Sequence, residues 1–175
     1  MKQCLAIDVG GSKILVGVVE ETGIVIEYVR KEYSEAYTLE SLYSDIKLMA
    51  TPYLEKYKLE ICGVSLPGPV NGQTGVCPLA PFLGIRGWHA AEELETILGI
   101  PVFAENGANA CAVAEKTFGK ATNVEDFMWI AVGNGVGGAL YLNGSLYVGA
   151  NFCAGEFGHI MVEENGDVCS CGKRG

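Results

Sequence analysis

Long apolar runs and basic residues are both scarce in this sequence of 175 residues. No run approaches the ~20 apolar residues that a transmembrane helix needs, so we expect no membrane-spanning protein. The N-terminus has no charged segment followed by an apolar one, so we expect no secretory signal. Only 12 Lys and Arg residues stand against 21 Asp and Glu residues, which gives a formal net charge of −9. Such an acidic chain is a poor electrostatic match for nucleic acid or for an anionic membrane.

Charged residues are also few, at 19% of the chain, whereas apolar residues make up 49%. This balance argues against a disordered chain and supplies enough material for a hydrophobic core. The seven cysteines are odd in number and are spread along a chain too long for a small disulfide scaffold. We therefore expect a reducing, cytoplasmic location, with most cysteines buried as small apolar side chains. Glycine is abundant instead, and its 24 residues gather in short runs that are typical of tight turns.

Apolar and β-branched runs predict the elements of the first part of the chain. Three closely connected runs predict a three-stranded meander. The region 38–58 has helical spacing, but Pro52 predicts a kink there or two short helices. Gly99 follows a later helical segment as a C-terminal cap. In chain order we expect strands at 3–9, 14–20 and 24–32, a helical region at 38–58, a strand at 60–66, loops at 70–87, a helix at 89–98, a strand at 101–105 and a helix at 108–118.

The same pattern begins again after residue 119. Asn143-Gly144 is a strong hairpin signal between two apolar runs. A strand that enters a glycine-rich turn and continues into a second strand thus occurs twice, about 125 residues apart. We interpret this as an internal duplication whose second copy is cut short, with a first lobe at 1–119 and the start of a second at 120–175. The strands expected in the second lobe lie at 127–132, 139–142 and 145–148.

The first glycine-rich turn reads Asp8-Val9-Gly10-Gly11-Ser12-Lys13. A strand follows it, which excludes the Rossmann and Walker A motifs because both need a helix there. Its backbone N–H groups can hold an anionic oxygen, with the Ser12 hydroxyl and the Lys13 ammonium as further donors. Asp8 would repel phosphate unless a cation lay between them, so Mg²⁺ bound through water is the natural partner. By itself, the segment fits a plain Gly-Gly hairpin with a surface lysine equally well.

The second glycine-rich turn consists of Gly133, Asn134, Gly135, Val136, Gly137 and Gly138. By itself it is explained by ordinary turn chemistry. The two turns together are more informative, because one lies in each half of the duplicated pattern. Two phosphate-binding hairpins, one in each lobe, are what a nucleotide cleft between two lobes requires.

Five motifs in a fixed order make the sequence similar to one family. They read DVGGSK, ENGANACAVAE, VGNGVGG, GEFGH and CSCGKRG. Together they resemble the ROK family of bacterial sugar kinases and repressors, with its glucokinases and N-acetylmannosamine and N-acetylglucosamine kinases. The resemblance covers residues 3–175 and corresponds to the N-terminal part of the family. It implies an α/β fold of the actin-like ATPase and hexokinase type, which is ribonuclease H-like, with a complete first lobe and a truncated second lobe. It also implies ATP with Mg²⁺, bound at Asp8 and by the two glycine-rich turns.

The match to the family fails at the position of its catalytic base. In the family this segment reads N-D-A-N, and its Asp takes the proton from the sugar hydroxyl. This chain has Gly107 there, and glycine carries no proton acceptor. General-base catalysis is worth about 10²–10⁴-fold, so we expect impaired or absent activity. Asn106 matches a sugar ligand of the family and fits a simple helix N-cap equally well.

The GEFGH segment matches the family motif whose Glu and His contact sugar hydroxyls, so the resemblance implies Glu156 and His159 as sugar ligands. Gly68 lies in a Pro-Gly-Pro loop that also corresponds to a sugar-contacting loop of the family. His159, Cys169 and Cys171 supply three zinc-type ligands. The family pattern continues to a fourth ligand that this sequence lacks, so we expect an incomplete structural Zn²⁺ site. A pair of reduced, exposed thiols is the alternative interpretation.

The sequence therefore predicts a cytoplasmic, ATP-dependent kinase that acts on a hexose or an N-acetylhexosamine. A catalytically inactive sugar-binding sensor is the alternative, and Gly107 motivates it. A DNA-binding regulator is disfavoured, because repressors of the family carry a winged helix-turn-helix ahead of the first strand and this chain starts at that strand. The expected partners are a small sugar and ATP, with no nucleic acid and no membrane. The resemblance leaves a homodimer open.

Overall fold

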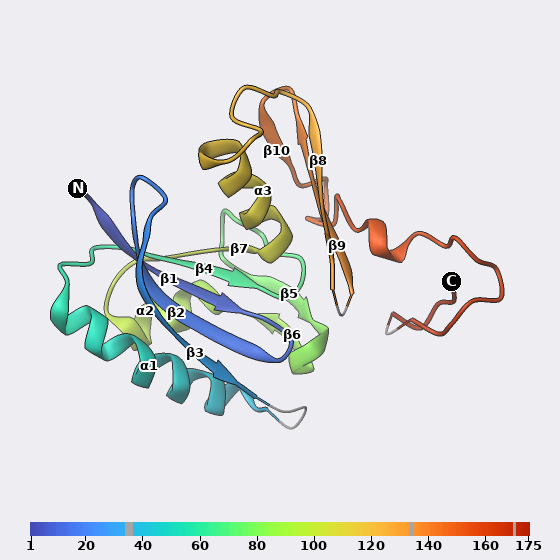
Figure 1. Ribbon diagram of the computed structural model, residues 1–175. Coiled ribbons are helices and arrows are strands. Elements are labelled where there is room, and N and C mark those ends of the chain that lie inside the picture. The colour runs from blue at the N-terminus through green and yellow to red at the C-terminus, as the bar shows by residue number, and fades with distance from the viewer. Residues whose placement is uncertain (34–36, 134, 170) are drawn as a thin grey trace. The chain divides into compact units, whose positions relative to one another are not determined.

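The structure is a computed structural model that describes residues 1–33, 37–133, 135–169 and 171–175. The chain forms two compact units, Met1–Ala110 and Cys111–Gly175 (Figure 1). The division lies within helix α3, Gly107–Phe118, and the lobe boundary predicted at residue 119 lies directly after that helix. Within the described ranges, no helix is both long enough and apolar enough to cross a membrane.

The first unit is built on a five-stranded sheet of β1 (Gln3–Val9), β2 (Lys13–Glu20), β3 (Val25–Glu32), β4 (Cys62–Leu66) and β7 (Val102–Asn106). The strand order is β3-β2-β1-β4-β7. The first three strands pair antiparallel, which confirms the predicted meander, and β4 and β7 continue the sheet in parallel to β1. Alternate residues of β1 are buried, at Leu5, Ile7 and Val9, as a strand with one covered face requires.

Helix α1, Leu39–Lys56, begins at Thr38, whose hydroxyl accepts a backbone N–H of the first turn at 3.1 Å. Pro52 lies inside this helix, so the predicted alternative of two short helices is wrong. Met49 is buried before the proline, and Leu54 packs against the same core after it. Burial on both sides of Pro52 thus outweighs the hydrogen bond that the proline cannot donate.

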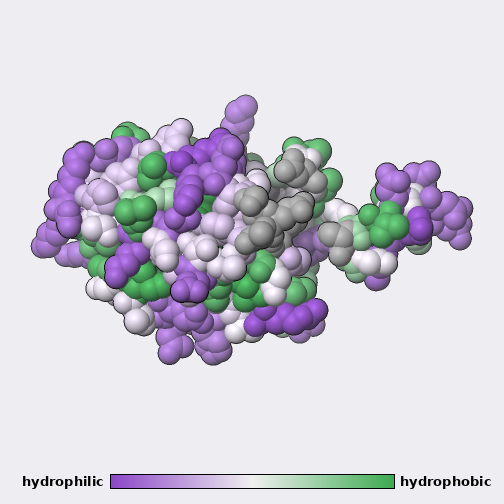
Figure 2. All heavy atoms as spheres, turned by 90° about the horizontal axis from the view of Figure 1, so that it is seen from below, coloured by the Kyte–Doolittle hydropathy of each residue, from purple (hydrophilic) through white to green (hydrophobic). Residues whose placement is uncertain are grey.

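Helix α2, Ala90–Leu98, packs against α1 and β7 and completes the core with the buried Leu94 and Leu98. Gly99 follows it with a left-handed φ of 73°, which confirms the predicted C-terminal cap. On the side where α1 lies, hydrophilic residues predominate among scattered hydrophobic ones (Figure 2). This distribution is typical of helices that bury one face only.

A short hairpin interrupts the region that was expected to consist of loops. Strands β5 (Cys77–Ala80) and β6 (Ile85–Trp88) pair antiparallel around a 3₁₀ turn at Pro81–Leu83. The prediction missed it because each strand has only four residues and no clear apolar alternation. The hairpin is fixed by burial instead, since Cys77, Ala80 and Trp88 all lie in the core.

Trp88 connects this hairpin to both helices through a chain of two hydrogen bonds. Its indole N–H donates to the Tyr43 hydroxyl of α1 at 2.6 Å, and that hydroxyl in turn donates to the Glu93 carboxylate of α2. Burial and the neighbouring Glu93 carboxylate raise the pKa of Tyr43. The hydroxyl therefore stays protonated at neutral pH and remains a donor.

The second unit contains a three-stranded antiparallel sheet in the order β10-β9-β8. Its strands are β8 (Phe127–Val132), β9 (Val136–Leu142) and β10 (Ser145–Tyr147). The turn between the last two has positive φ values at Asn143 (52°) and Gly144 (70°). These values confirm the hairpin predicted from the Asn-Gly pair.

The cysteines are less buried than the sequence led us to expect. Only Cys62 and Cys77 lie in the core, whereas Cys111, Cys153 and Cys171 are exposed. The expectation that most are buried is therefore wrong. The expectation rested on the average burial of cysteine in proteins. Cys111, Cys153 and Cys171 instead follow the last strand of the five-stranded sheet and lie on the surface of a helix or of loops.

We expect the core thiols to resist alkylation in the folded protein. Burial raises the pKa of the Cys62 thiol to about 12, so only about one molecule in 10⁴ carries the thiolate at pH 8. Iodoacetamide at pH 8, added to metal-free protein and followed by peptide mass spectrometry, should modify Cys153 and Cys171 and spare Cys62 and Cys77. In 6 M guanidinium chloride the reduced protein should react at all four. Rapid modification of Cys62 under native conditions would contradict the burial described above.

Candidate functional site

The first glycine-rich turn connects β1 to β2 at the carboxyl end of β1. The Gly10 N–H donates to the Lys13 carbonyl at 2.9 Å and closes the turn. Asp8 is exposed on the last part of β1, and Ser12 is exposed at the tip of the turn. A Cβ atom at Gly10 would lie 3.4 Å from the Lys13 carbonyl, at the short end of van der Waals contact. The turn thus presents a carboxylate, a hydroxyl, an ammonium group and backbone N–H groups within six residues.

Polar side chains form a row across the carboxyl ends of the three parallel strands. Asp8 of β1 lies beside Ser65 of β4, and Ser65 lies beside Glu105 of β7. The Ser65 hydroxyl donates to the Asp8 carboxylate. In open α/β sheets, ligands bind outside the carboxyl ends of the parallel strands, which is where this row lies. Sequence reasoning missed Ser65, because only strand pairing places it next to Asp8.

Asn106 ends β7 and caps α3. Its side-chain oxygen accepts the N–H groups of Ala108 at 2.8 Å and Asn109 at 3.1 Å. Its amide donates to the Gly68 carbonyl at 2.8 Å and so holds the predicted sugar-binding loop. The structure therefore shows the capping role that the sequence left open, and one amide N–H remains for a further acceptor.

Removing this cap should lower stability measurably. Asn106→Ala deletes the cap and the bond to Gly68, and the loss of an N-cap costs about 0.5–2 kcal/mol. For a chain of this size, 1 kcal/mol corresponds to about 2–4 °C in Tm. Asn106→Asp keeps the capping oxygen and serves as the control. Thermal unfolding followed by circular dichroism is the measurement, and equal Tm values for Ala and Asp would contradict the capping role.

Glu105 is engaged by its own neighbours. Its Oε1 atom accepts the backbone N–H of Asn106 at 2.8 Å and the side-chain amide of Asn109 at 3.0 Å. Asn109 is only 3% exposed, so this bond satisfies a buried amide. Glu105 thus has a structural task at the start of α3.

Gly107 is the first residue of α3, next to the Asn106 cap. A Cβ atom there would meet only the Leu66 carbonyl, at an ordinary 3.8 Å. Neither crowding nor a positive φ explains the glycine, so the fold would accept a side chain at this position. Neither packing nor backbone conformation therefore requires glycine at this position.

The second glycine-rich turn divides into two parts. Gly133 donates its N–H to the Gly135 carbonyl at 2.9 Å, and added Cβ atoms at both would meet open space. Gly138 differs, since a Cβ there would lie 2.4 Å from the Phe157 ring and 2.7 Å from the Gly155 carbonyl. Val136 and Gly137 belong to β9, whereas Asn134 lies outside the described residues. Packing therefore explains Gly138 but not Gly133 or Gly135.

The GEFGH segment packs on the start of β9. Gly155 has a left-handed φ of 89°, and a Cβ there would lie 2.6 Å from the Gly138 carbonyl. A Cβ at Gly158 would lie 2.1 Å from the Val136 carbonyl. The two glycines thus allow the short 3₁₀ turn η2, Phe157–His159, to approach the strand. This approach fixes the backbone that carries the Glu and His side chains of the motif.

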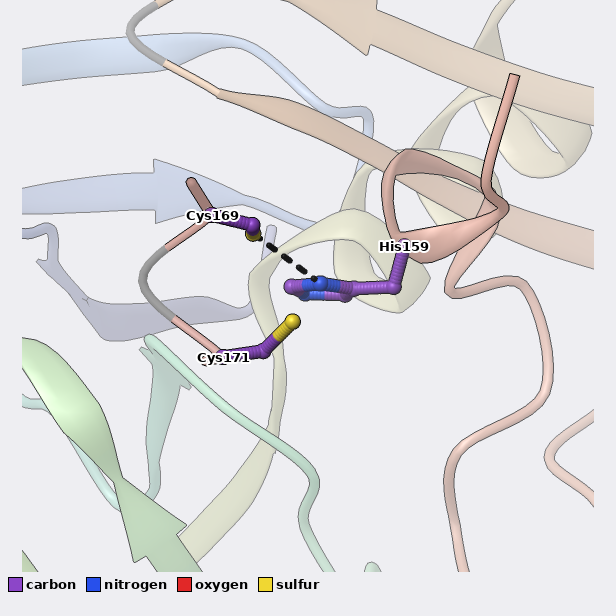
Figure 3. A group of neighbouring side chains, drawn as sticks. All are labelled: His159, Cys169 and Cys171. Atoms are coloured by element: carbon purple, nitrogen blue, oxygen red, sulfur yellow. Dashed lines mark hydrogen bonds between the residues drawn. The ribbon is translucent and has the colours of Figure 1, made fainter. Parts of the chain in front are cut away.

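His159, Cys169 and Cys171 point toward one another (Figure 3). Their ligand atoms all lie within 4.8 Å of one another, as the sequence spacing suggested. The His159 Nδ1 atom lies 3.6 Å from the Cys169 sulfur, and its Nε2 atom faces a Glu156 carboxylate oxygen at 3.8 Å. One imidazole nitrogen and two thiolates are a donor set that suits Zn²⁺. Carboxylates commonly orient zinc-binding histidines, but at 3.8 Å the Glu156 carboxylate is beyond hydrogen-bond distance of this ring nitrogen.

Comparisons with known proteins identify the family of this chain. The sequence matches the ROK family over residues 4–175. It is 29% identical to the glucokinase of Thermotoga maritima over 174 residues, which cover 98% of this chain and 54% of that protein. It is 37% identical to a putative xylose repressor of Caldicellulosiruptor over 139 residues, which cover 78% of this chain and 35% of that protein. The chain thus spans about half of the glucokinase and about a third of the repressor.

Among solved structures, a ROK family glucokinase from Streptomyces griseus in complex with glucose and AMPPNP superposes with a TM-score of 0.90. It is 31% identical, and the match covers 99% of this chain and 55% of that one. The strand meander extended by parallel strands, and the meander that begins again in the second unit, are thus parts of an actin-like, hexokinase-type fold. The chain belongs to the ROK family.

Proposed function

We propose that this chain is part of an ATP-dependent sugar kinase that transfers the γ-phosphoryl group of ATP to a hydroxyl of a hexose or an N-acetylhexosamine. The observation that carries the proposal is the pair of glycine-rich strand turns, one in each unit. Gly133 and Gly135 have no packing reason to be glycine, and the Asp8–Lys13 turn is open to solvent at its tip. Close approach of the backbone to phosphate is a physical reason for glycine in such turns. Similarity to glucokinases supports the same conclusion.

In this proposal, the two turns bind the phosphates of the nucleotide. Backbone N–H groups of Gly10 and Gly11, the Ser12 hydroxyl and the Lys13 ammonium serve the first turn. The residues of the second turn are Gly133, Asn134, Gly135, Val136, Gly137 and Gly138, although the packing of Gly138 makes it a support and not a contact. Asp8 would hold Mg²⁺ through water, and the Ser65 hydroxyl orients its carboxylate. Mg²⁺ bound there would neutralise negative charge on the phosphate oxygens.

The sugar would be held by Asn106, Glu156 and His159, with the Gly68 loop positioned by Asn106. Asn106 offers its remaining amide N–H, and Glu156 offers a carboxylate for charge-assisted hydrogen bonds. Transfer joins the sugar oxygen to the γ-phosphorus, breaks the bond to the β-phosphate oxygen and releases the hydroxyl proton. No side chain at Gly107 takes that proton, so it must pass to water or phosphate. We therefore expect slow transfer.

The same geometry suits a second function, a sugar-binding regulator without catalysis. The missing carboxylate at Gly107 favours it, and a repressor is among the relatives. Isothermal titration calorimetry with a hexose panel, combined with an ADP-release assay, separates the two functions. The kinase proposal expects saturable sugar binding with detectable turnover below the usual enzyme range of about 1–10³ s⁻¹. Sugar binding with no ADP release above background would favour the regulator, and no sugar binding would contradict both.

We also propose that His159, Cys169 and Cys171 bind Zn²⁺. The three side chains supply donors of the right type, and a structural zinc site takes four. The fourth position would be filled by water or by another thiol. The metal would tie the loop that carries the cysteines to the turn that carries Glu156 and His159, and so would steady the two sugar ligands.

A further inference from the structure

Tyr33 contacts the first glycine-rich turn at two points. It directly follows β3, and its backbone N–H donates to the Ser12 carbonyl at 2.9 Å. Its side-chain hydroxyl donates to the Gly10 carbonyl. The turn itself has one internal backbone bond, from Gly10 to Lys13. Tyr33 thus adds two hydrogen bonds from outside to a loop that contains two adjacent glycines and has little stiffness of its own.

The Tyr33 ring is supported by a second aromatic ring. It stacks on the Tyr37 ring with centroids 4.2 Å apart and planes 12° from parallel. The Tyr37 hydroxyl donates to Asp45 of α1, and the Lys31 ammonium of β3 binds the same carboxylate at 2.6 Å. The ring that reaches Gly10 is therefore braced against both a helix and a strand. Burial, with a smaller contribution from the Asp8 charge, raises the pKa of Tyr33, so its hydroxyl remains a donor at neutral pH.

The contact at Gly10 determines how the next N–H is directed. A trans peptide is planar, so the Gly10 carbonyl and the Gly11 N–H point in opposite directions. A donor that fixes the carbonyl on one side of the chain presents the N–H on the other side. Rotation of this Gly-Gly peptide would otherwise cost little, because neither residue has a side chain to hinder it.

We propose that Tyr33 is a positioning residue for phosphate: its hydroxyl holds the Gly10–Gly11 peptide so that the Gly11 N–H is aimed at a bound phosphate oxygen. This inference rests on the proposed function, since it assigns the first turn to phosphate. Tyr33 does not touch the ligand. It acts by removing the rotational freedom that the turn would otherwise lose upon binding.

The test uses the ¹⁵N-labelled chain and two Tyr→Phe variants. Tyr33→Phe removes the hydroxyl and keeps the stacked ring. Tyr43→Phe is the control. It also removes a hydrogen-bonded hydroxyl from the first unit, but that hydroxyl donates to Glu93 and does not contact the turn. The probes are Mg²⁺-tripolyphosphate and MgATP, and the readout is the Gly11 amide signal in ¹H–¹⁵N spectra. Tm values of both variants report general destabilisation.

We expect a saturable shift of the Gly11 amide in the unmodified chain. Tyr33→Phe should raise the Kd of both probes about two- to tenfold, the equivalent of one net hydrogen bond. It should also broaden the Gly11 signal before any probe is added, because the peptide is released. Tyr43→Phe should leave the Kd within a factor of two.

The outcomes separate this inference from the function on which it rests. No saturable shift in the unmodified chain would contradict the assignment of the turn to phosphate, and the role of Tyr33 with it. A normal shift in the unmodified chain with an unchanged Kd in Tyr33→Phe would overturn the positioning role alone. Equal weakening by both variants, in step with their Tm values, would also overturn it, because the effect would then be general destabilisation.

Discussion

Replacing Gly107 by Asp should raise the rate of phosphoryl transfer to sugar by about 10²–10⁴-fold, the usual effect of a positioned general base. The position has room for a side chain, since the nearest atom to an added Cβ is the Leu66 carbonyl at 3.8 Å. A carboxylate in the first turn of α3 is also favoured by the helix dipole, so the fold should not be weakened. The measurement is ADP release at saturating ATP with a panel of hexoses and N-acetylhexosamines.

The matched control is Gly107→Asn, which has nearly the same size and shape as Asp but cannot accept the hydroxyl proton. The Asp variant should be faster than the Asn variant by the full factor, while the Kd for sugar changes little in either. If the Asp and Asn variants turn over equally slowly, the site lacks more of the catalytic machinery than the general base alone. The regulator would then be the better proposal.

Zinc affinity should depend strongly on the two clustered cysteines. Binding free energies of structural zinc are about 10–16 kcal/mol for four ligands, or about 3 kcal/mol for each. Cys169→Ser or Cys171→Ser should therefore weaken Zn²⁺ binding about 10²-fold. Competition with a chromophoric chelator at pH 7 measures the affinity, and the release of thiol protons accompanies binding. With three protein ligands, the affinity should stay below that of a four-ligand site.

Cys153→Ser is the control for this experiment. Cys153 is exposed in the same unit, and its thiol contacts the Asn151 carbonyl at 3.1 Å instead of the cluster. Its replacement should leave zinc affinity unchanged. Should all three serine variants bind Zn²⁺ as the unmodified chain does, the metal lies elsewhere, and the cluster is a pair of reduced thiols beside a histidine.

Most of the fold could be predicted from local sequence patterns. The meander, the Gly99 cap and the Asn143-Gly144 turn were predictable because each depends on neighbours in sequence, through β-branched runs or through positive φ. The β5–β6 hairpin was not predictable in this way. Its strands are too short to show alternation, and its stability comes from burying Trp88 in the core, where the indole bonds to Tyr43 of α1.

The candidate site was only partly predictable, for a related reason. The glycine-rich turns and the His159 cluster appear as compact motifs, so the sequence shows them directly. Ser65 was missed because its partner Asp8 lies 57 residues away and is brought beside it only by parallel strand pairing. The two possible roles of Asn106, helix cap and sugar ligand, could be compared only when its three hydrogen bonds were known.

The position of Trp88 also makes the two units separately observable. The chain has two tryptophans, Trp88 in the first unit and Trp129 on β8 in the second. Trp88 is 2% exposed and hydrogen-bonded to a tyrosine, so its emission should lie to the blue and move to the red when the first unit unfolds. Each unit thus contains its own intrinsic fluorophore. Single-tryptophan forms of the chain would report whether the units melt together or one after the other, without any attached dye.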